Sequence, residues 1–562
     1  MSFSSPKMSL LSALSGPPDT LDGRNVLQYV IMLTVLLVAI VPIVALTTGL
    51  PVLALVAVAG LFYTATLLAT ESIFEGLSAA IFVLVTFSAN VPLVELPLGG
   101  EEYTTPILNA LLVDVVVIPF AGLMLWWLYS GKISLNFGRE RIVGYALAGF
   151  VCWSLLAGLV GNGPSRLAGL FYVVVQLRHL VLFTISAVIV KYIGIRSAVY
   201  SLGIAIVGQL MYAMAEILNY GSFGLTYLGD SGSGPGPAFS VGPLQFEYAL
   251  YAGGFAGTSR ILVALLLLVI PVIVAIVVRR SIVWKLAAAV ALVCSTLLVR
   301  VSQTDSGFAA FLFTALLMAI ALCTLWIATD TTDRTPRDRT SDYVSGISST
   351  VGLAALSVFL FTRREISRTS RSTKATGTSG GDSASGTSAF GGVSSTRSNS
   401  EVGSDFMIQI ANQIPFIETT NFSIRLQQYI AAIDIGLQYP LFGIGGMNFP
   451  LVAESYGLPR PIEIHNIYLS ILASTGFPGA VFFLLSISAV LVIAGKKAMS
   501  SESDHLFWAM LICGMLGFHA YSFWVTIHSG GVAYLVFWVL AGTVVGANRR
   551  QETDITSRSS AT

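Results

Sequence analysis

The chain has 562 residues, which is long enough for several soluble domains, but only 10% of them are Asp, Glu, Lys or Arg. Ordinary globular proteins carry about 25% charged residues, so the composition excludes a soluble surface of the usual kind. The 30 basic and 29 acidic residues give a net charge of +1, which excludes recruitment of nucleic acid by overall charge. Hydrophobic residues make up 55% of the sequence, and the mean hydropathy of +0.80 predicts a membrane protein.

Apolar stretches of about 20 residues, the length that crosses a bilayer core, recur along the chain. Residues 1–25 precede the first stretch and show no small-residue cleavage site after a short apolar core. We therefore expect a cytoplasmic N-terminal tail and no cleaved signal peptide. The stretches predict an all-α, polytopic bundle of about 14 transmembrane helices. The predicted spans are 26–48, 50–70, 73–94, 106–130, 142–160, 167–190, 197–218, 261–278, 282–299, 307–328, 345–361, 466–494, 505–527 and 530–547.

The short loops predict the orientation, because Lys and Arg accumulate on the cytoplasmic side of membrane proteins. With the N-terminus inside, the predicted inner loops carry most of the basic residues: Lys132, Arg139, Arg141, Lys191, Arg196, Arg279, Arg280, Lys285, Arg334, Arg337, Arg339, Lys496 and Lys497. The predicted outer loops carry Glu95, Glu101 and Glu102, with little basic charge beyond Arg166, Arg260 and Arg300. We expect a multi-pass protein of the plasma (cytoplasmic) membrane with both termini in the cytoplasm.

This alternation divides the chain into four parts after the N-terminal tail. They are a transmembrane bundle of about 11 helices over 26–361, an outer loop over 362–465, three more transmembrane helices over 466–547 and a cytoplasmic tail over 548–562.

Two predicted outer segments are longer than ordinary connections. Residues 219–260 are rich in Gly and Pro and contain several aromatic residues, so they form either a flexible tether or a mobile lid that meets sugar rings. The second segment is 362–465, and its residues 368–404 are a Ser, Thr and Gly tract that is too polar to offset its own ordering entropy. We predict disorder in this tract.

Apolar residues return over 405–465, the predicted amphipathic and catalytic segment. One helix face is predicted from Leu426, Tyr429, Ile430, Ile433 and Leu437, and the other side from Gln427, Gln428, Asp434 and Gln438. We expect an amphipathic helix that ends at Pro440 and lies on the outer membrane surface or on the transmembrane bundle.

Three motifs follow Arg425 in order: P-L-F-G-I-G-G over 440–446, H-N-I-Y-L over 465–469 and G-F-P-G over 476–479. These motifs and the late outer loop resemble the O-antigen ligase and polymerase superfamily of membrane glycosyltransferases. In that family an outer loop carries an Arg near an amphipathic helix, a P-L-F-G-x-G turn and an H-N-x-x-L motif entering the next membrane helix. The sequence departs from the family at Ser474 and Tyr429, where Glu and Trp are common.

The resemblance implies transfer of a glycan from a polyprenyl-phosphate or pyrophosphate carrier to an acceptor hydroxyl on the outer face, by a ligase or a polymerase. Its implied partners are that lipid-linked donor, a glycan, lipid or protein acceptor, and membrane lipid. No D-x-D pair occurs in a predicted outer loop. We therefore expect metal-independent catalysis, with no metal site and no cofactor.

His465 is the expected catalytic base. It lies at the N-terminal end of a predicted outer-to-inner helix, where the helix dipole disfavours imidazolium, and a neutral ring can accept a hydroxyl proton. We expect unpaired N–H groups from Asn466 to Leu469, so Asn466 and Tyr468 are expected to help bind a lipid phosphate. The alternative is a capping or interfacial histidine bound to backbone.

Arg425 is the second expected catalytic residue, because a guanidinium can hold two oxygens of a phosphate leaving group. The alternative is an interfacial Arg that snorkels beside the amphipathic helix. Arg178 and His179 fall near the middle of an apolar span, where an unpaired charge costs about 2.5 to 3.5 kcal/mol. We expect them to bind substrate or to form a structural pair with Glu216 or a helix carbonyl.

Four further residues near these motifs complete the expected site. Arg460 is expected to bind substrate, and Glu463 either orients the imidazole or is a solvated loop charge. Gly443 and Gly445 are assigned to the substrate site, although they lack the Lys-Ser/Thr of a P-loop and are expected mainly to let the loop turn.

Two histidines near the outer end of the thirteenth span, His519 and His528, are expected to be packing or interface histidines. A different class of function also fits the composition: a transporter or lipid-linked oligosaccharide flippase, with Arg178 and His179 in a substrate or proton path.

Overall fold

The structure of the protein is a computed structural model. It describes residues 73–95, 107–219, 221–223, 235–236, 239–241, 244–246, 249–250, 252–278, 282–301, 305–328, 419–458, 463–500, 505–525 and 531–547. The predicted spans 26–48, 50–70 and 345–361, both terminal tails and the 368–404 tract lie outside these ranges.

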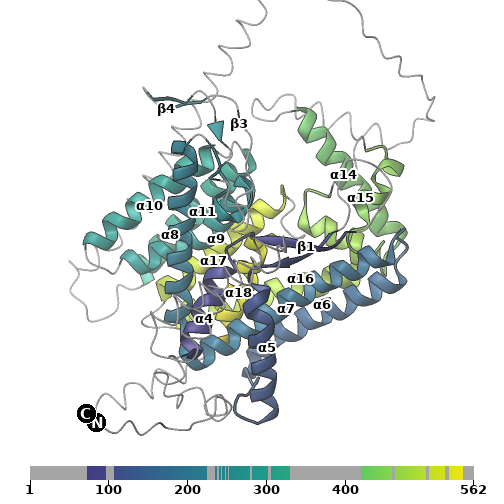
Figure 1. The fold of residues 1–562 in the computed structure, drawn as a ribbon, viewed down its shortest axis with the longest axis horizontal. Coiled ribbons are helices and arrows are strands. Elements are labelled where there is room, and N and C mark those ends of the chain that lie inside the picture. The colour runs from purple at the N-terminus through teal and green to yellow at the C-terminus, as the bar shows by residue number, and fades with distance from the viewer. Residues whose placement is uncertain are drawn as a thin grey trace, which may run out of the picture.

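Helices make up most of the described chain (Figure 1). They are α4 (Ile73–Leu84), α5 (Asp114–Tyr129), η1 (Gly138–Glu140), α6 (Arg141–Val160), α7 (Arg166–Ile193), α8 (Ile195–Asn219), η3 (Gly254–Ala256), α9 (Ser259–Val278), α10 (Ile282–Val301), α11 (Asp305–Ala328), α14 (Thr419–Gln438), α15 (Phe449–Val452), η4 (Ala453–Tyr456), α16 (Ile467–Ser500), α17 (His505–Ser522) and α18 (Val532–Gly546). The strands are β1 (Asn90–Glu95), β2 (Ile107–Leu111), β3 (Pro235–Gly236), β4 (Phe239–Val241), β5 (Leu244–Phe246) and β6 (Ala249–Leu250).

The long helices coincide with predicted spans, because each follows an apolar stretch of bilayer-crossing length. Among the described residues, five helices are long and apolar enough to cross a membrane. They are Gly138–Val160, Arg166–Ile193, Ala198–Asn219, Ser306–Leu325 and Ile467–Ser500. The expectation of a mostly helical protein with membrane-crossing helices is confirmed, and the count of about 14 spans stays a prediction.

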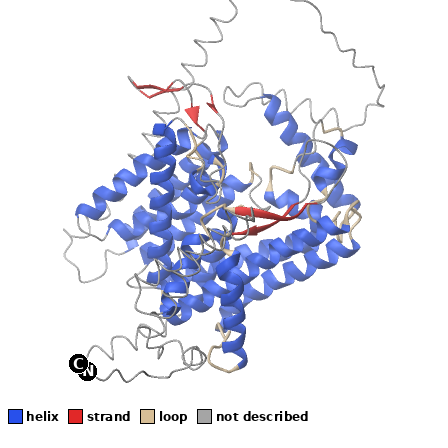
Figure 2. Ribbon diagram, viewed as in Figure 1, coloured by secondary structure: helices blue, strands red, loops and turns tan. Residues whose placement is uncertain are grey.

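Two predicted spans, 73–94 and 106–130, are only partly helical. Their helical portions are α4 and α5, and between these helices β1 and β2 form an antiparallel pair whose register shifts between Pro92 and Val94. Proline has no N–H for a ladder bond, which accounts for an irregularity there. The all-α expectation is wrong to this extent: the described part also contains three two-stranded sheets, two of them within 219–260 (Figure 2).

Helix α18 is the centre of the main hydrophobic core, and every residue from Val532 to Gly546 is buried. It packs on α7 and α9, and Gly542 allows it to approach the Ser186 side chain of α7 closely. The Ser186 hydroxyl donates to the Val539 carbonyl at 2.9 Å. A helix buried on all sides must be apolar all round, and the sequence of α18 satisfies this requirement.

A second, smaller core holds α14 against α15, η4 and the first part of α16. Its buried apolar residues are Ala431, Ala432, Ile435, Ile444, Phe449, Ala453, Leu458, Ile464 and Ala473. Gly436 lets α14 approach Leu472 of α16. In Figure 1, α14 and α15 lie together at the upper right of the molecule, above the right-hand part of the long helices α6 and α7.

The orientation of α14 differs from the expected packing of its apolar face. Ile430, Ile433 and Leu437 are exposed, whereas Gln428 and Ala432 face inward and are fully buried. Leu426 and Tyr429, the other two residues of the predicted face, are half-buried, so only part of this face packs on the protein. Contact of the exposed face with the outer membrane surface stays a prediction.

Helix α16 is kinked at Gly476, whose φ of 68° and ψ of −174° lie in a region that essentially only glycine adopts. The kink brings the helix against the 440–446 loop, where the Phe477 N–H donates to the Pro440 carbonyl at 2.8 Å. The Trp153 indole of α6 donates to the carbonyls of Leu441, at 3.1 Å, and Thr475, at 3.0 Å. Two of the sequence motifs therefore form one packed unit.

We expect Gly476→Ala to lower the free energy of unfolding by about 1 to 3 kcal/mol or more, because the strained backbone disfavours a side chain. An added Cβ would also meet the carbonyls of Pro440 and Leu441. The matched control is Gly495→Ala on the same helix, where a Cβ meets nothing within 4 Å. Thermal unfolding in detergent measures both variants, and equal midpoints would contradict the assigned strain.

Candidate active site

His465 lies two residues before the start of α16 and is held by Gln428 of α14. Its backbone N–H donates to Gln428 Oε1 at 3.3 Å, and its ring Nδ1 lies 3.0 Å from the same oxygen. The histidine is half-buried and Gln428 is fully buried. Glu463 is half-buried, and its role in orienting the imidazole stays a prediction. Sequence reasoning missed Gln428, because it was placed on the polar side of the amphipathic helix.

Asn466 caps the N-terminus of α16. Its Oδ1 accepts from the backbone N–H groups of Tyr468, at 3.0 Å, and Leu469, at 3.1 Å. The expectation of four unpaired N–H groups from Asn466 to Leu469 is therefore wrong for these two. The two residues of the H-N pair therefore have different roles: Asn466 caps the start of α16, and His465 is the residue before the cap.

Tyr429 supports His465 from the next position of α14. Its hydroxyl lies 3.0 Å from the His465 carbonyl and 2.7 Å from the Phe523 carbonyl at the end of α17. Burial raises the pKa of Tyr429 to about 12, although the positive charge of Arg425 opposes the shift. The phenol therefore stays protonated near neutral pH. The effect of Arg425 on this pKa indicates that the guanidinium lies near Tyr429, the tyrosine that supports His465.

Tyr468 points into the bundle toward α17. Its hydroxyl lies 2.9 Å from His519 Nδ1, and its ring packs against that of Phe523 with centroids 4.5 Å apart. His519 was expected to be a packing histidine, and it is buried with ring contacts to Phe518 and Phe537. His528 lies outside the described residues.

Arg178 forms a partly buried ion pair with Asp114 of α5. Its Nη2 donates to Asp114 Oδ2 at 2.7 Å and to the Asn109 carbonyl at 2.8 Å. The two side chains are 11% and 14% exposed. Asp114 Oδ2 also accepts from the Leu111 N–H at 2.9 Å, so the pair ties α7 to the start of α5 and to β2.

A structural pair with Glu216 or a helix carbonyl was one expectation for Arg178; the pair exists, but its partners are Asp114 and the Asn109 carbonyl of β2. Glu216 accepts from the Gly254 N–H at 2.9 Å instead. His179 is fully buried, and its Nδ1 lies 3.0 Å from Gln176 Oε1 on the same helix. Both residues of α7 therefore have contacts within the protein.

The glycines of the 440–446 loop permit close packing. Gly443 and Gly445 have φ values of 59° and 77°, and Gly446 lies directly against the Tyr172 ring of α7. The Gly443 carbonyl accepts from the Asn162 N–H at 3.1 Å. The expectation that these glycines let the loop turn and approach neighbouring backbone is confirmed, and their contact with substrate stays a prediction.

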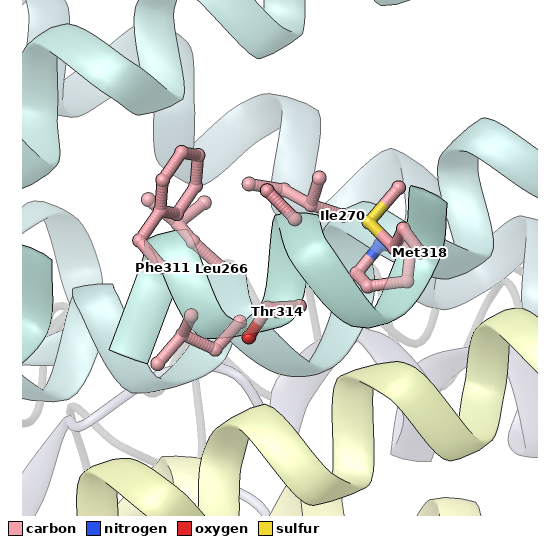
Figure 3. A pocket seen from close by; sticks show the side chains of 8 residues that line it. Leu266, Ile270, Phe311, Thr314 and Met318 are labelled. Atoms are coloured by element: carbon pink, nitrogen blue, oxygen red, sulfur yellow. The ribbon is translucent and has the colours of Figure 1, made fainter. Parts of the chain in front are cut away.

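A small pocket next to the site is lined by Tyr172, Met447, Phe449, Pro450, Glu463, Ile464, Ser470 and Ser474. Ser474 stands here where the family often has Glu. A second pocket, between α9 and α11, is apolar apart from Thr314 (Figure 3). The Thr314 hydroxyl donates to the Ala310 carbonyl at 2.8 Å, so this pocket has no evident chemistry.

Arg460 lies outside the described residues, so its role in substrate binding stays a prediction. The described part of the chain contains no group of three or more His, Cys, Asp or Glu side chains placed to hold a metal ion. Metal-independent transfer stays a prediction from the sequence.

The fold and the site together define a largely helical membrane protein, in which a histidine precedes a kinked apolar helix and is supported by a second, amphipathic helix that carries an arginine. Residues 290–484 match the family model described as O-antigen ligase. The match includes the chain from Arg425 to Gly479 and confirms the resemblance to the O-antigen ligase and polymerase superfamily. No curated protein matches the sequence significantly.

We expect Asp114→Ala to lower the free energy of unfolding by about 3 to 5 kcal/mol, because Arg178 would keep its charge in a partly buried site without its carboxylate. The double variant Arg178→Met with Asp114→Leu should recover much of this loss, since it removes both charges. Thermal unfolding in detergent measures the three proteins. A double variant as unstable as Asp114→Ala would contradict the ion pair as the source of the effect.

Proposed function

We propose that the protein transfers a glycan from a polyprenyl-phosphate or pyrophosphate carrier to an acceptor hydroxyl at the outer face of the cytoplasmic membrane. The observation that carries the proposal is His465 of the H-N-x-x-L motif. This residue lies within the family match and is supported by the helix that bears Arg425. The family supports the class of reaction, and the helices support the membrane setting.

In the proposed reaction, His465 accepts the proton of the acceptor hydroxyl. The oxygen forms a bond to the anomeric carbon of the donor sugar, and the bond from that carbon to the carrier phosphate breaks. A positioned general base contributes about 10² to 10⁴ in rate. The half-buried position of His465 suits this role, because a fully buried ring could not meet the acceptor.

Arg425 is proposed to hold the phosphate or pyrophosphate leaving group. It lies one turn before Tyr429 on α14, and its charge acts on that phenol. A guanidinium can bind two phosphate oxygens in parallel and stabilise the charge that develops as the bond breaks. Asn466 and Tyr468 would then act mainly by positioning the start of α16 and its contact with α17.

The proposal covers both a ligase that attaches a finished glycan and a polymerase that joins repeat units. The two differ only in the acceptor that supplies the hydroxyl. The alternative function as a transporter rested on Arg178 and His179 in a substrate path. The Asp114 and Gln176 contacts account for these two residues within the fold, so the structure favours the transferase.

We expect His465→Ala to lower transfer by about 100-fold or more, because it removes the proposed base. Arg425→Lys keeps the positive charge but loses the paired geometry, so we expect a smaller loss than in Arg425→Ala. Purified protein is incubated with a labelled polyprenyl-linked glycan and an acceptor, and label transferred from the carrier is measured.

The matched control is Gln427→Ala, an exposed residue on the same helix, which should leave transfer unchanged. Full transfer by normally folded His465→Ala and Arg425→Ala proteins would refute the proposed function.

A further inference from the structure

Gln428 is a fully buried polar residue whose carboxamide oxygen faces two nitrogens of His465. One of them, the backbone N–H, can only donate a hydrogen bond. The atom of Gln428 that faces it at 3.3 Å must therefore be the oxygen, because the amide NH2 would place donors against a donor. This contact settles the orientation of the carboxamide on chemical grounds.

The same oxygen lies 3.0 Å from Nδ1 of the ring. An unprotonated Nδ1 would place a lone pair against the oxygen lone pairs, so the contact requires a proton on Nδ1. A carbonyl oxygen has two lone pairs and can accept both bonds. In a neutral imidazole only one nitrogen carries a proton, so the lone pair of His465 is on Nε2.

We propose that Gln428 is a positioning residue that holds neutral His465 in the Nδ1–H tautomer and thereby makes Nε2 the proton-accepting atom. The inference rests on the proposed function, since it names the atom of the proposed base that acts. Gln428 acts through His465, as second partners of catalytic and metal-binding histidines commonly do.

Burial makes this contact persistent. Gln428 faces the second core beside Ala431 and Ala432, so bulk water does not compete for its oxygen. The Tyr429 hydroxyl contacts the His465 carbonyl from the adjacent position, so α14 holds both the backbone and the ring of His465. The carboxamide Nε2 has no hydrogen-bond partner among the described residues, so nothing there favours the opposite orientation.

The tautomer is tested directly by nitrogen NMR of the full chain in lipid nanodiscs with ¹⁵N-labelled histidine. The sequence contains 5 histidines, and the spectrum of His465→Ala assigns the His465 signals by difference. We expect the pattern of a ring protonated at Nδ1 and unprotonated at Nε2. A ring protonated at Nε2, or an even mixture of the two forms, would overturn the proposal.

Two variants test the role of the oxygen. Gln428→Glu keeps an oxygen acceptor of the same length and should keep the proton on Nδ1, whether or not the carboxylate charge also favours protonation of Nε2. Gln428→Leu removes the acceptor, so we expect a mixture of tautomers and a fall in kcat of about tenfold or more, with KM within about twofold. Gln427→Leu, at an exposed neighbouring position, is the matched control and should change neither quantity.

The outcomes separate this inference from the proposed function. A folded Gln428→Leu protein that keeps both the tautomer and kcat refutes the positioning role, even if His465→Ala abolishes transfer. Full transfer by His465→Ala refutes the proposed function, whereas the NMR spectrum still reports the tautomer. If Gln428→Leu does not fold, the wild-type and Gln428→Glu spectra decide the question.

Discussion

The packing of α14 against the first part of α16 is the contact on which the candidate site depends. Gln428 and Tyr429, adjacent on α14, reach the ring and the backbone of His465, while Asn466 begins α16 at the next residue. Small residues on the inner face of α14, including Gly436 against Leu472, allow this close approach. If α14 were displaced, the histidine would lose both of these supports.

The kink in α16 determines how this helix packs against the 440–446 loop. A straight helix would satisfy its own backbone through Gly476, but the kink turns the Phe477 N–H to the Pro440 carbonyl. Asn448 adds a second tie to the turn between α6 and α7: its Oδ1 accepts from the Ser165 N–H at 2.9 Å, and its Nδ2 donates to the Ser165 carbonyl at 3.0 Å. The site is therefore built on segments that hydrogen bonds tie to the long helices, and such rigid support suits a reaction that depends on position.

Charged residues inside the apolar helices also have hydrogen-bond partners within the protein. Arg178 is matched by Asp114 and the Asn109 carbonyl, and Glu216 accepts from the Gly254 N–H. The cost of a charge in an apolar setting made Arg178 a functional candidate from sequence. That reasoning identified the residue as unusual, but a cost of this kind is offset equally well by a structural partner, and only the folded chain shows which partner is present.

The sequence by itself determined the helical class, most helix boundaries and the motifs that mark the site, because apolar length and local turn residues are properties of neighbouring positions in the chain. It also identified the glycines of the 440–446 loop as turning points, as Gly443 and Gly445 show. It could not show that β1 and β2 pair, that Ile430, Ile433 and Leu437 of α14 are exposed, or that Gln428 meets His465. Most of these features depend on residues that are far apart in the sequence. Tertiary packing decided them, because it determines which side chains are buried and which polar groups lie close enough to form hydrogen bonds.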